Sequence, residues 1–237
     1  MKNTLKLIMF DLDGTILSMD QDEFIKTYFK ELVKSVAHLG YEPNFIIDSV
    51  WSGCRAINSN NGTRLNKDVF WDKMKQIFGD RTEEISKAFD NYYKTTFDSV
   101  RRVSVKDEKA IELVKRLKSQ GYKIALATSP LFPSIATEQR IGWAGLTPND
   151  FDLYTTYENS TYSKPNLDYY KEIMDSFNVS PDECIMVGND VDEDMVVAEL
   201  GVKVFLLTDH LLNRHDKDIS KYPRGSFKDL EEYFDSL

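Results

Sequence analysis

The sequence predicts an α/β protein with a parallel sheet core, helices on both faces of the sheet, and an inserted α-helical domain. Two observations lead to this prediction. From Val105 onwards, apolar strand-like runs alternate with amphipathic helical segments, and a block with only helical periodicity separates this part from a first apolar run at 5–11. Such alternation is typical of a parallel sheet, because each crossover between parallel strands carries a helix.

The block from Asp22 to about Ser99 shows helical periodicity throughout. Apolar side chains recur there at three- and four-residue spacing, which places them along one stripe of each helix. We expect four helices, of which one ends at Gly40, one spans 43–58, one ends at Gly79 and one begins near Thr82.

In the rest of the chain, the pattern of apolar residues predicts the strands of the sheet and the helices that cover it. Uninterrupted apolar runs favour buried strands, and apolar residues at helical spacing favour the helices between them. The expected strands are 5–11, 123–127, 151–156, 184–187 and 202–207, and the expected helices are 107–120, 134–141, 167–177, 192–200 and 227–234.

Composition excludes several classes of partner. The 237 residues carry a net charge of −9 and a pI of about 5.0, which argues against nucleic acid and membrane partners, since both bind basic surfaces. No segment approaches the roughly 18–20 apolar residues that span a bilayer, and Asp11 interrupts the only apolar run in which a signal peptide could lie. We therefore expect a cytoplasmic protein.

The cysteines and histidines carry no recognisable metal pattern. Cys54 and Cys184 are the only cysteines and lie far apart in the sequence, so we expect two reduced thiols. His38, His210 and His215 lack metal-ligand spacing, and we interpret His210 and His215 as surface residues.

Two carboxylates at the end of the first apolar run are the first candidate site. Asp11 and Asp13 are two positions apart, so in extended backbone they project to the same side. They tolerate this closeness if a cation lies between them or if one of them holds a proton. Asp13-Gly14 between two apolar runs is also typical of a hairpin turn, and this segment alone leaves both interpretations open.

Polar residues that follow other expected strands support the first interpretation. Thr128 and Ser129 follow the strand at 123–127, and Asp190 follows the strand at 184–187. Lys164 precedes a helix, after a loop. Each also has an ordinary interpretation, as a turn former, a solvated lysine or a helix-start charge.

Taken together, these residues supply carboxylates for a hard cation, and a hydroxyl and a lysine for an oxyanion. These are the types of side chain that enzymes use for phosphoryl transfer with Mg²⁺. The acids at 190–194 also have the spacing of a calcium loop, but Met195 occupies the position where such a loop needs glycine.

The combined motifs resemble the haloacid dehalogenase superfamily of aspartate-nucleophile phosphatases. The resemblance covers most of the chain and implies a Rossmann-like core over 1–17 and 100–237, with a helical cap over 18–99. The four motifs, in order, are Asp11-Leu12-Asp13-Gly14-Thr15, then Thr128, then Lys164 in Ser163-Lys164-Pro165, and finally the pair Asp190 and Asp194.

The resemblance also implies a role for each residue. Asp11 would be the nucleophile, and Asp13 would be the general acid and base. Mg²⁺ would be held by Asp11, the Asp13 carbonyl and Asp190, with Asp194 as a further metal-site acid. Phosphoryl oxygens would be bound by Thr128, Ser129 and Lys164, and Lys164 would also restrain Asp11.

Two features depart from the common pattern or lack a motif. Asn189 is an extra residue between Gly188 and Asp190, which leaves open which of Asp190, Asp192 and Asp194 contact the metal. In the cap, Arg55 and Arg64 flank a polar loop and are candidates for substrate contact; ordinary surface arginines are the alternative.

We expect a Mg²⁺-dependent phosphomonoester hydrolase that acts on a small phosphorylated metabolite and is a monomer or homodimer. The presence of Asp13 argues against dehalogenase and phosphonatase chemistry, because the resemblance assigns those enzymes no acid at this position. Two alternatives stay open: a phosphomutase, in which a sugar phosphate accepts the phosphoryl group, and a regulatory protein that binds phosphate ligands without turnover.

Overall fold

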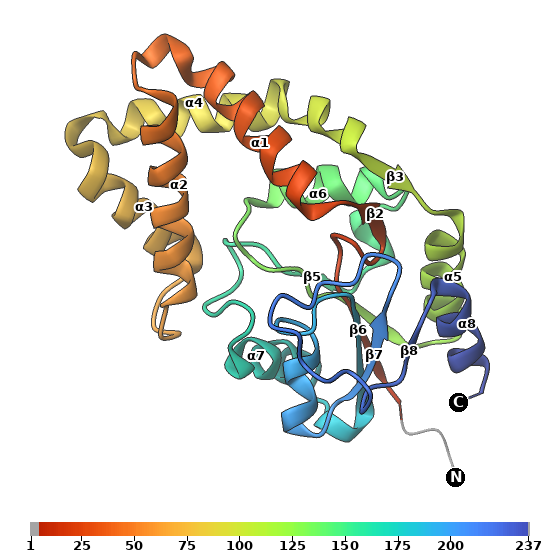
Figure 1. Ribbon diagram of the computed structural model, residues 1–237. Helices are drawn as coiled ribbons and strands as arrows, with labels where there is room; N and C mark the ends of the chain where they lie inside the picture. Colours follow the sequence, from red (N-terminus) through yellow and green to blue (C-terminus); the bar gives the residue numbers. More distant parts are fainter. Residues whose placement is uncertain (1–4, 237) are drawn as a thin grey trace.

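The computed structural model describes residues 5–236 and contains a six-stranded parallel sheet (Figure 1). The strand order is β5-β4-β1-β6-β7-β8. The predicted α/β class is therefore confirmed. The strands are β1 (Leu7–Phe10), β4 (Lys123–Leu126), β5 (Leu153–Tyr154), β6 (Cys184–Gly188), β7 (Lys203–Leu207) and β8 (Arg224–Gly225).

Side chains of β1 alternate between two hydrophobic clusters. Ile8 and Phe10 belong to the larger cluster, Leu7 and Met9 belong to the smaller one, and all four are fully buried. Because successive side chains of a strand point to opposite faces, each face of the sheet has its own apolar cover. Burial on both faces explains why β1 is a continuous apolar run.

Helices on both sides complete these clusters. The larger cluster includes α5 (Glu108–Ser119), α6 (Ser134–Trp143) and α8 (Phe227–Asp235), and the smaller one includes α7 (Leu167–Phe177). Within the described residues, no helix is both long enough and apolar enough to cross a membrane.

The predicted helix over 192–200 is wrong in length and type. The structure forms a 3₁₀ helix over Met195–Leu200 only. The backbone N–H groups of Asp192 and Glu193 donate to Asp190 Oδ1 at 2.8 and 3.0 Å. Because a side-chain acceptor competes with helical hydrogen bonding, this segment turns around the Asp190 carboxylate instead.

Four α-helices form a lobe on one side of the sheet (Figure 1), as the periodicity predicts. We call this lobe the cap. The chain returns from it through a 3₁₀ helix, Phe97–Val103. The cap helices are α1 (Gln21–Val36), α2 (Pro43–Asn58), α3 (Asn66–Phe78) and α4 (Thr82–Thr95). Short 3₁₀ helices also occur at Ala37–Leu39 and Gly79–Arg81 between cap helices, and at Pro148–Asp150 and Pro181–Glu183 in the rest of the chain.

A two-stranded antiparallel ribbon, which we did not predict, lies where the chain enters and leaves the cap. In this ribbon β2 (Leu17–Met19) pairs with β3 (Ser104–Lys106). Strands of three residues are too short to show a periodicity in the sequence. The ribbon lies near the limits expected for the cap, 18–99, and those limits stay a prediction.

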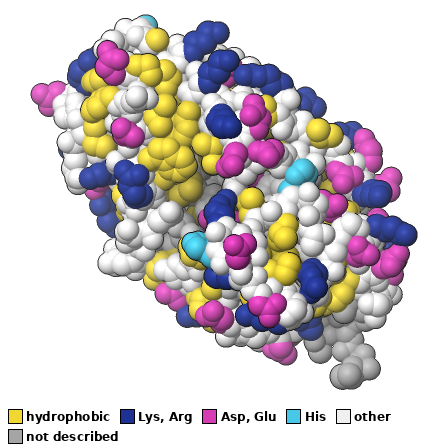
Figure 2. Space-filling model, in the orientation of Figure 1, with side chains coloured by type: hydrophobic (Ala, Val, Ile, Leu, Met, Phe, Trp, Pro, Cys, Tyr) yellow, Lys and Arg dark blue, Asp and Glu magenta, His cyan; other side chains and the backbone are white. Residues whose placement is uncertain are grey.

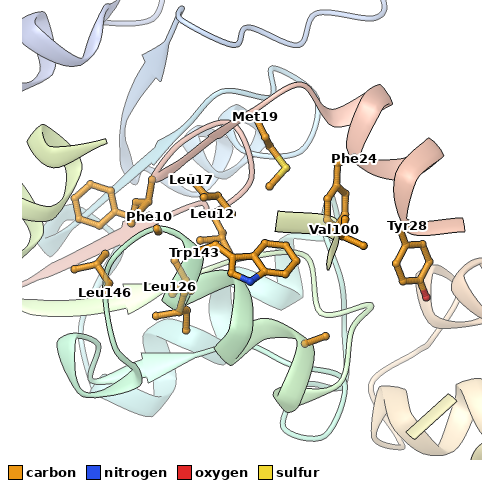
Figure 3. Packing of buried hydrophobic residues seen from close by; sticks show 14 of the residues in the cluster. Phe10, Leu12, Leu17, Met19, Phe24, Tyr28, Val100, Leu126, Trp143 and Leu146 are labelled. Atoms are coloured by element: carbon orange, nitrogen blue, oxygen red, sulfur yellow. The ribbon is translucent and has the colours of Figure 1, made fainter. Parts of the chain in front are cut away.

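The larger hydrophobic cluster runs without a break from the sheet into the cap (Figure 3). Phe10 and Leu126 of the sheet, Trp143 of α6, and Phe24 and Tyr28 of α1 all belong to it. Apolar burial therefore holds the inner side of the cap against the core.

Asp152 links β5 to β4 through hydrogen bonds to its carboxylate. The Ile124 N–H donates to Oδ2 at 3.0 Å, and Lys123 Nζ donates to Oδ1 at 3.1 Å. Burial would raise the pKa of Asp152, but these two donors outweigh it and lower the pKa. The stabilisation is therefore full above the ordinary pKa of about 4 and is lost as pH falls through the folded-state pKa.

We expect Asp152→Asn to lower the free energy of unfolding by about 1 kcal/mol at pH 7. At pH 3 the loss should be smaller, because this carboxyl in the unfolded chain, with an ordinary pKa of about 4, is by then mostly protonated, which stabilises the unfolded wild-type chain. Urea unfolding at both pH values measures the difference. An equal loss at pH 3 and pH 7 would contradict the assignment.

Candidate active site

The carboxyl ends of three neighbouring strands bring sequence-predicted residues together. Phe10, the last residue of β1, is aligned with Leu126 of β4 and Val187 of β6. Asp11 and Thr128 therefore follow their strands at the same edge of the sheet, and the β6 strand delivers its acids there too. In parallel α/β sheets this is the edge at which ligands bind.

A buried lysine joins two carboxylates at this edge. Lys164 is 2% exposed, and its Nζ donates to Asp11 Oδ1 at 2.7 Å and to Asp194 Oδ1 at 2.6 Å. Burial alone would lower the pKa of Lys164, but Asp11 and Asp194 outweigh it and raise the pKa well above its ordinary value. Lys164 is therefore a cation that restrains Asp11.

Both oxygens of Asp194 are engaged within the protein. Oδ1 accepts from Lys164, and Oδ2 accepts the Asp190 N–H at 3.0 Å. A Cβ at Gly188 would lie 2.1 Å from Asp194 Oδ2, so the carboxylate reaches this place only because residue 188 is glycine. The geometry makes Asp194 a partner of Lys164.

Asp13 has its own cationic partner, Arg140 of α6. Arg140 Nη1 donates to Asp13 Oδ2, and the guanidinium lies 4.4 Å from the centre of the Phe132 ring. The Arg140 side chain is 1% exposed. Within residues 5–236, Asp13 Oδ1 and Arg140 Nε are the buried side-chain polar atoms without a hydrogen-bond partner.

The surroundings of Asp13 favour its protonated form more than water does. Burial raises the pKa of Asp13, Arg140 opposes this, and the nearby Asp11 raises it further, so that the pKa lies above its ordinary value. A carboxyl group with a raised pKa holds a proton at higher pH and is suited to donate it.

Asp190 and Asp192 differ in their partners, although both lie in the same turn. Asp190 Oδ2 accepts from Arg214 Nη1 at 2.6 Å, and Arg214 Nη2 donates to Gln21 Oε1, at the start of cap helix α1, at 2.6 Å. Asp192 instead pairs with His215 and Lys217, whose side chains are 71% and 54% exposed. The structure thus directs Asp192 towards surface cations.

The extra residue Asn189 connects two loops of the site. Its Oδ1 accepts from Thr15 Oγ1 at 3.0 Å, and its Nδ2 donates to the His210 carbonyl at 2.7 Å. Gly14, with φ of +85°, lies so close that a Cβ there would be 2.4 Å from Asn189 Nδ2. The Asp-Gly segment therefore packs against the loop after β6 and does not form a simple hairpin.

Oxygen donors suited to Mg²⁺ lie at this edge. They are the carboxylates of Asp11 and Asp190 and the carbonyl of Asp13. No set of three or more His, Cys, Asp or Glu side chains in the described part of the chain is arranged to hold a metal by itself. Magnesium ordinarily uses one or two carboxylates and completes its shell with water and phosphate oxygens, so the donor set fits it.

A cavity of about 270 Å³ extends from these residues to the inner side of the cap. Asp13, Thr128, Ser129 and Arg140 line its core end, and cap aromatics line much of the rest. Figure 2 shows hydrophobic side chains around a hollow between the two lobes. The cavity therefore joins Asp13 and Thr128 to an apolar space.

The structure does not bring Arg55 and Arg64 to this cavity. Both line a separate recess between α2 and α3. Arg55 donates to Ser52 Oγ, and Arg64 pairs with Asp72 at 2.5 Å. Their contact with substrate stays a prediction, and this placement does not support it. One residue along a helix is about 100° of rotation, and Cys54, the neighbour of Arg55, faces the cavity instead.

Sequence reasoning missed Arg140 and Arg214. Arg140 shares a buried helical face with Ala136, Thr137 and Ile141, and an arginine within such an apolar stripe is a recognisable sign of a buried ion pair. Arg214 lies in a polar loop outside helices and strands, and nothing in the local sequence distinguishes it from a surface arginine.

Comparisons with known proteins agree with this geometry. The family model of haloacid dehalogenase-like hydrolases matches residues 5–208. A protein of Methanocaldococcus jannaschii named glyceraldehyde 3-phosphate phosphatase is 26% identical over 236 residues, 98% of each chain. A Clostridium perfringens protein provisionally named pyrophosphatase PpaX is 28% identical over 200 residues, 84% of this chain and 82% of the relative.

A solved structure shows the same fold. The crystal structure of a predicted phosphoglycolate phosphatase from Haemophilus somnus superposes with a TM-score of 0.62 at 19% identity, and covers 99% of this chain and 100% of its own. The family model spans most of the sequence and includes every strand end at which the charged residues meet. The chain therefore belongs to the haloacid dehalogenase-like hydrolase family.

Proposed function

We propose that the protein is a Mg²⁺-dependent phosphomonoester hydrolase that acts on a small phosphorylated metabolite through a phosphoaspartate intermediate. One observation carries this proposal: two adjacent carboxylates have different cationic partners, Asp11 with Lys164 and Asp13 with Arg140. The family and the phosphatase names of its relatives support it.

In the first step, a carboxylate oxygen of Asp11 attacks phosphorus and the bond from phosphorus to the leaving oxygen breaks. Asp13 donates its proton to that oxygen, so the product leaves as an alcohol. Lys164 holds Asp11 Oδ1 at 2.7 Å, which limits the directions in which the carboxylate can turn.

In the second step, water attacks phosphorus of the phosphoaspartate. Asp13, now ionised, takes the proton from that water, and Asp11 is released together with inorganic phosphate. The raised pKa of Asp13 suits both halves, because the group is able to hold a proton first and to accept one afterwards.

Residues at the same sheet edge as Asp11 and Asp13 would bind the metal ion and the phosphate. The side chains of Asp11 and Asp190 and the carbonyl of Asp13 would hold Mg²⁺, which when bound supplies positive charge to offset that of the phosphate. We assign Asp194 to Lys164, because both of these side chains are only 1% exposed and Lys164 holds Oδ1 at 2.6 Å. Asp190 Oδ2 instead faces Arg214, whose side chain is 49% exposed, and a metal ion would take the place of this guanidinium. Thr128, Ser129 and Lys164 would bind the phosphoryl oxygens.

The proposal includes a cytoplasmic location, and the state of the two cysteines agrees with it. Cys54 and Cys184 are both free, as expected in a reducing compartment. A substrate screen should include glyceraldehyde 3-phosphate, after which two relatives are named, together with sugar phosphates and nucleotides.

We expect Asp11→Asn to reduce Mg²⁺-dependent release of phosphate from 4-nitrophenyl phosphate by about 1,000-fold or more, because the nucleophile is removed. Chelation of Mg²⁺ should abolish the wild-type reaction. The measurement is steady-state phosphate release.

Asp192→Asn is the matched control, because this acid faces His215 and Lys217 and should keep its activity. An Asp11→Asn protein that folds normally and still releases phosphate at the wild-type rate would refute the nucleophile assignment.

We also expect Arg140→Met to lower the free energy of unfolding by about 3 kcal/mol, because it leaves the buried Asp13 carboxylate without its cation. In an Asp13→Asn background the same change should lower the free energy of unfolding by less, because no carboxylate at position 13 is left without its cation. A double-mutant cycle by urea unfolding measures this coupling. Identical losses in the two backgrounds would show that Arg140 acts by packing alone.

A further inference from the structure

Aromatic side chains line much of the cavity that begins at Asp13. Each cap helix contributes at least one: Phe24 from α1, Trp51 from α2, Trp71 from α3 and Phe89 from α4. The core contributes Phe132, whose ring also supports Arg140. Because Asp13 and Thr128 line the same cavity, whatever group is attached to a phosphate at the strand ends would lie among these rings.

Three tyrosine hydroxyls and one indole N–H of the aromatic walls are already paired with each other. The hydroxyls of Tyr28 and Tyr93 share a hydrogen bond of 2.8 Å, and Trp71 Nε1 donates to the Tyr157 hydroxyl at 3.4 Å. The Cys54 thiol also faces the cavity and stays neutral, since burial raises its pKa to about 12. The walls therefore present mostly carbon to a ligand.

Free hydrogen-bonding capacity lies at the phosphate end. The buried atoms without a partner in the described residues are Asp13 Oδ1 and Arg140 Nε. Glu193, Arg214 and Ser129 also line the cavity. Among the remaining polar groups, the side-chain oxygen of Gln21 accepts from Arg214, that of Asn58 accepts from Ser163 at 2.9 Å, and Asp90 is exposed to solvent. A chain of hydroxyl groups would leave several of them unpaired, and each unpaired buried hydroxyl weakens binding by roughly tenfold.

We propose that the substrate is a phosphomonoester of an alcohol that carries one apolar aromatic ring. This inference rests on the proposed phosphatase function and specifies its leaving group. The volume of about 270 Å³ lies just below the range of about 300–1,000 Å³ typical of small-molecule pockets. It therefore suits a leaving group with one ring better than a larger one. Aromatic walls favour a ring over an aliphatic chain through edge-to-face and offset contacts.

The test compares two primary alkyl phosphates, 2-phenylethyl phosphate and glycerol 1-phosphate, with Mg²⁺ and the full-length wild-type protein. Their leaving groups are both primary alcohols, so a large difference reports on the cavity. We expect kcat/KM to be about 10- to 100-fold higher for 2-phenylethyl phosphate, as burial of one ring predicts.

Two variants on the same helix locate the effect. Cys54→Phe fills the cavity and should reduce kcat/KM for 2-phenylethyl phosphate by about tenfold, with glycerol 1-phosphate changed by less than about threefold. Ala56→Phe adds the same ring to the separate recess between α2 and α3 and should leave both substrates unchanged.

The outcomes separate the two proposals. Equal kcat/KM values, a preference for glycerol 1-phosphate, or turnover of other phosphomonoesters but not of 2-phenylethyl phosphate would overturn the aromatic leaving group and leave the phosphatase standing. No turnover of any phosphomonoester would overturn the proposed function and this inference with it. A Cys54→Phe protein that folds normally and has the same ratio of kcat/KM values for the two substrates as the wild type would also overturn the inference.

Discussion

The arrangement of the site depends on one buried cation. Lys164 lies between Asp11 and Asp194, and each of these three groups would be costly to bury alone. Their pairing couples three segments: the loop after β1, the loop after β6, and the loop that precedes α7. The orientation of Asp11, on which the proposed nucleophilic attack depends, follows from this triad and from the glycine at 188 that admits Asp194.

A second buried pair gives the two carboxylates of the first loop different chemistry. Asp13 is paired with Arg140, which leaves one carboxylate oxygen and one guanidinium nitrogen without partners. The aromatic side chains of the cap line the cavity beside this pair, and less polar surroundings strengthen charge interactions. In the proposed mechanism the cap would therefore act in two ways: it would shape the space for the leaving group, and it would set the electrostatic conditions for proton transfer.

The sequence predicted much of the core side of this site and little of its cap side. Asp11, Thr128 and Asp190 were predicted because parallel strands end at one edge, so local patterns at three strand ends indicate a common site. Lys164 and Asp194 were assigned to the site through the resemblance to a known family. Arg140 escaped notice because its partner Asp13 lies 127 residues away. The place of Arg55 depends on the rotation of helix α2, and that of Arg64 depends on the loop before α3, so neither follows from the charge alone.

What the sequence by itself determined was the periodicity of each segment, the order of strands and helices, and the chemical kinds of residue after each strand. These are local properties, since apolar spacing and turn residues act within a few positions. Only the tertiary structure decided which cation each carboxylate received, that Asp192 faces surface cations while Asp194 faces Lys164, and that aromatic residues from four helices enclose one cavity. These contacts join residues far apart in the chain, and they arise only when burial forces charges to pair and apolar faces to meet.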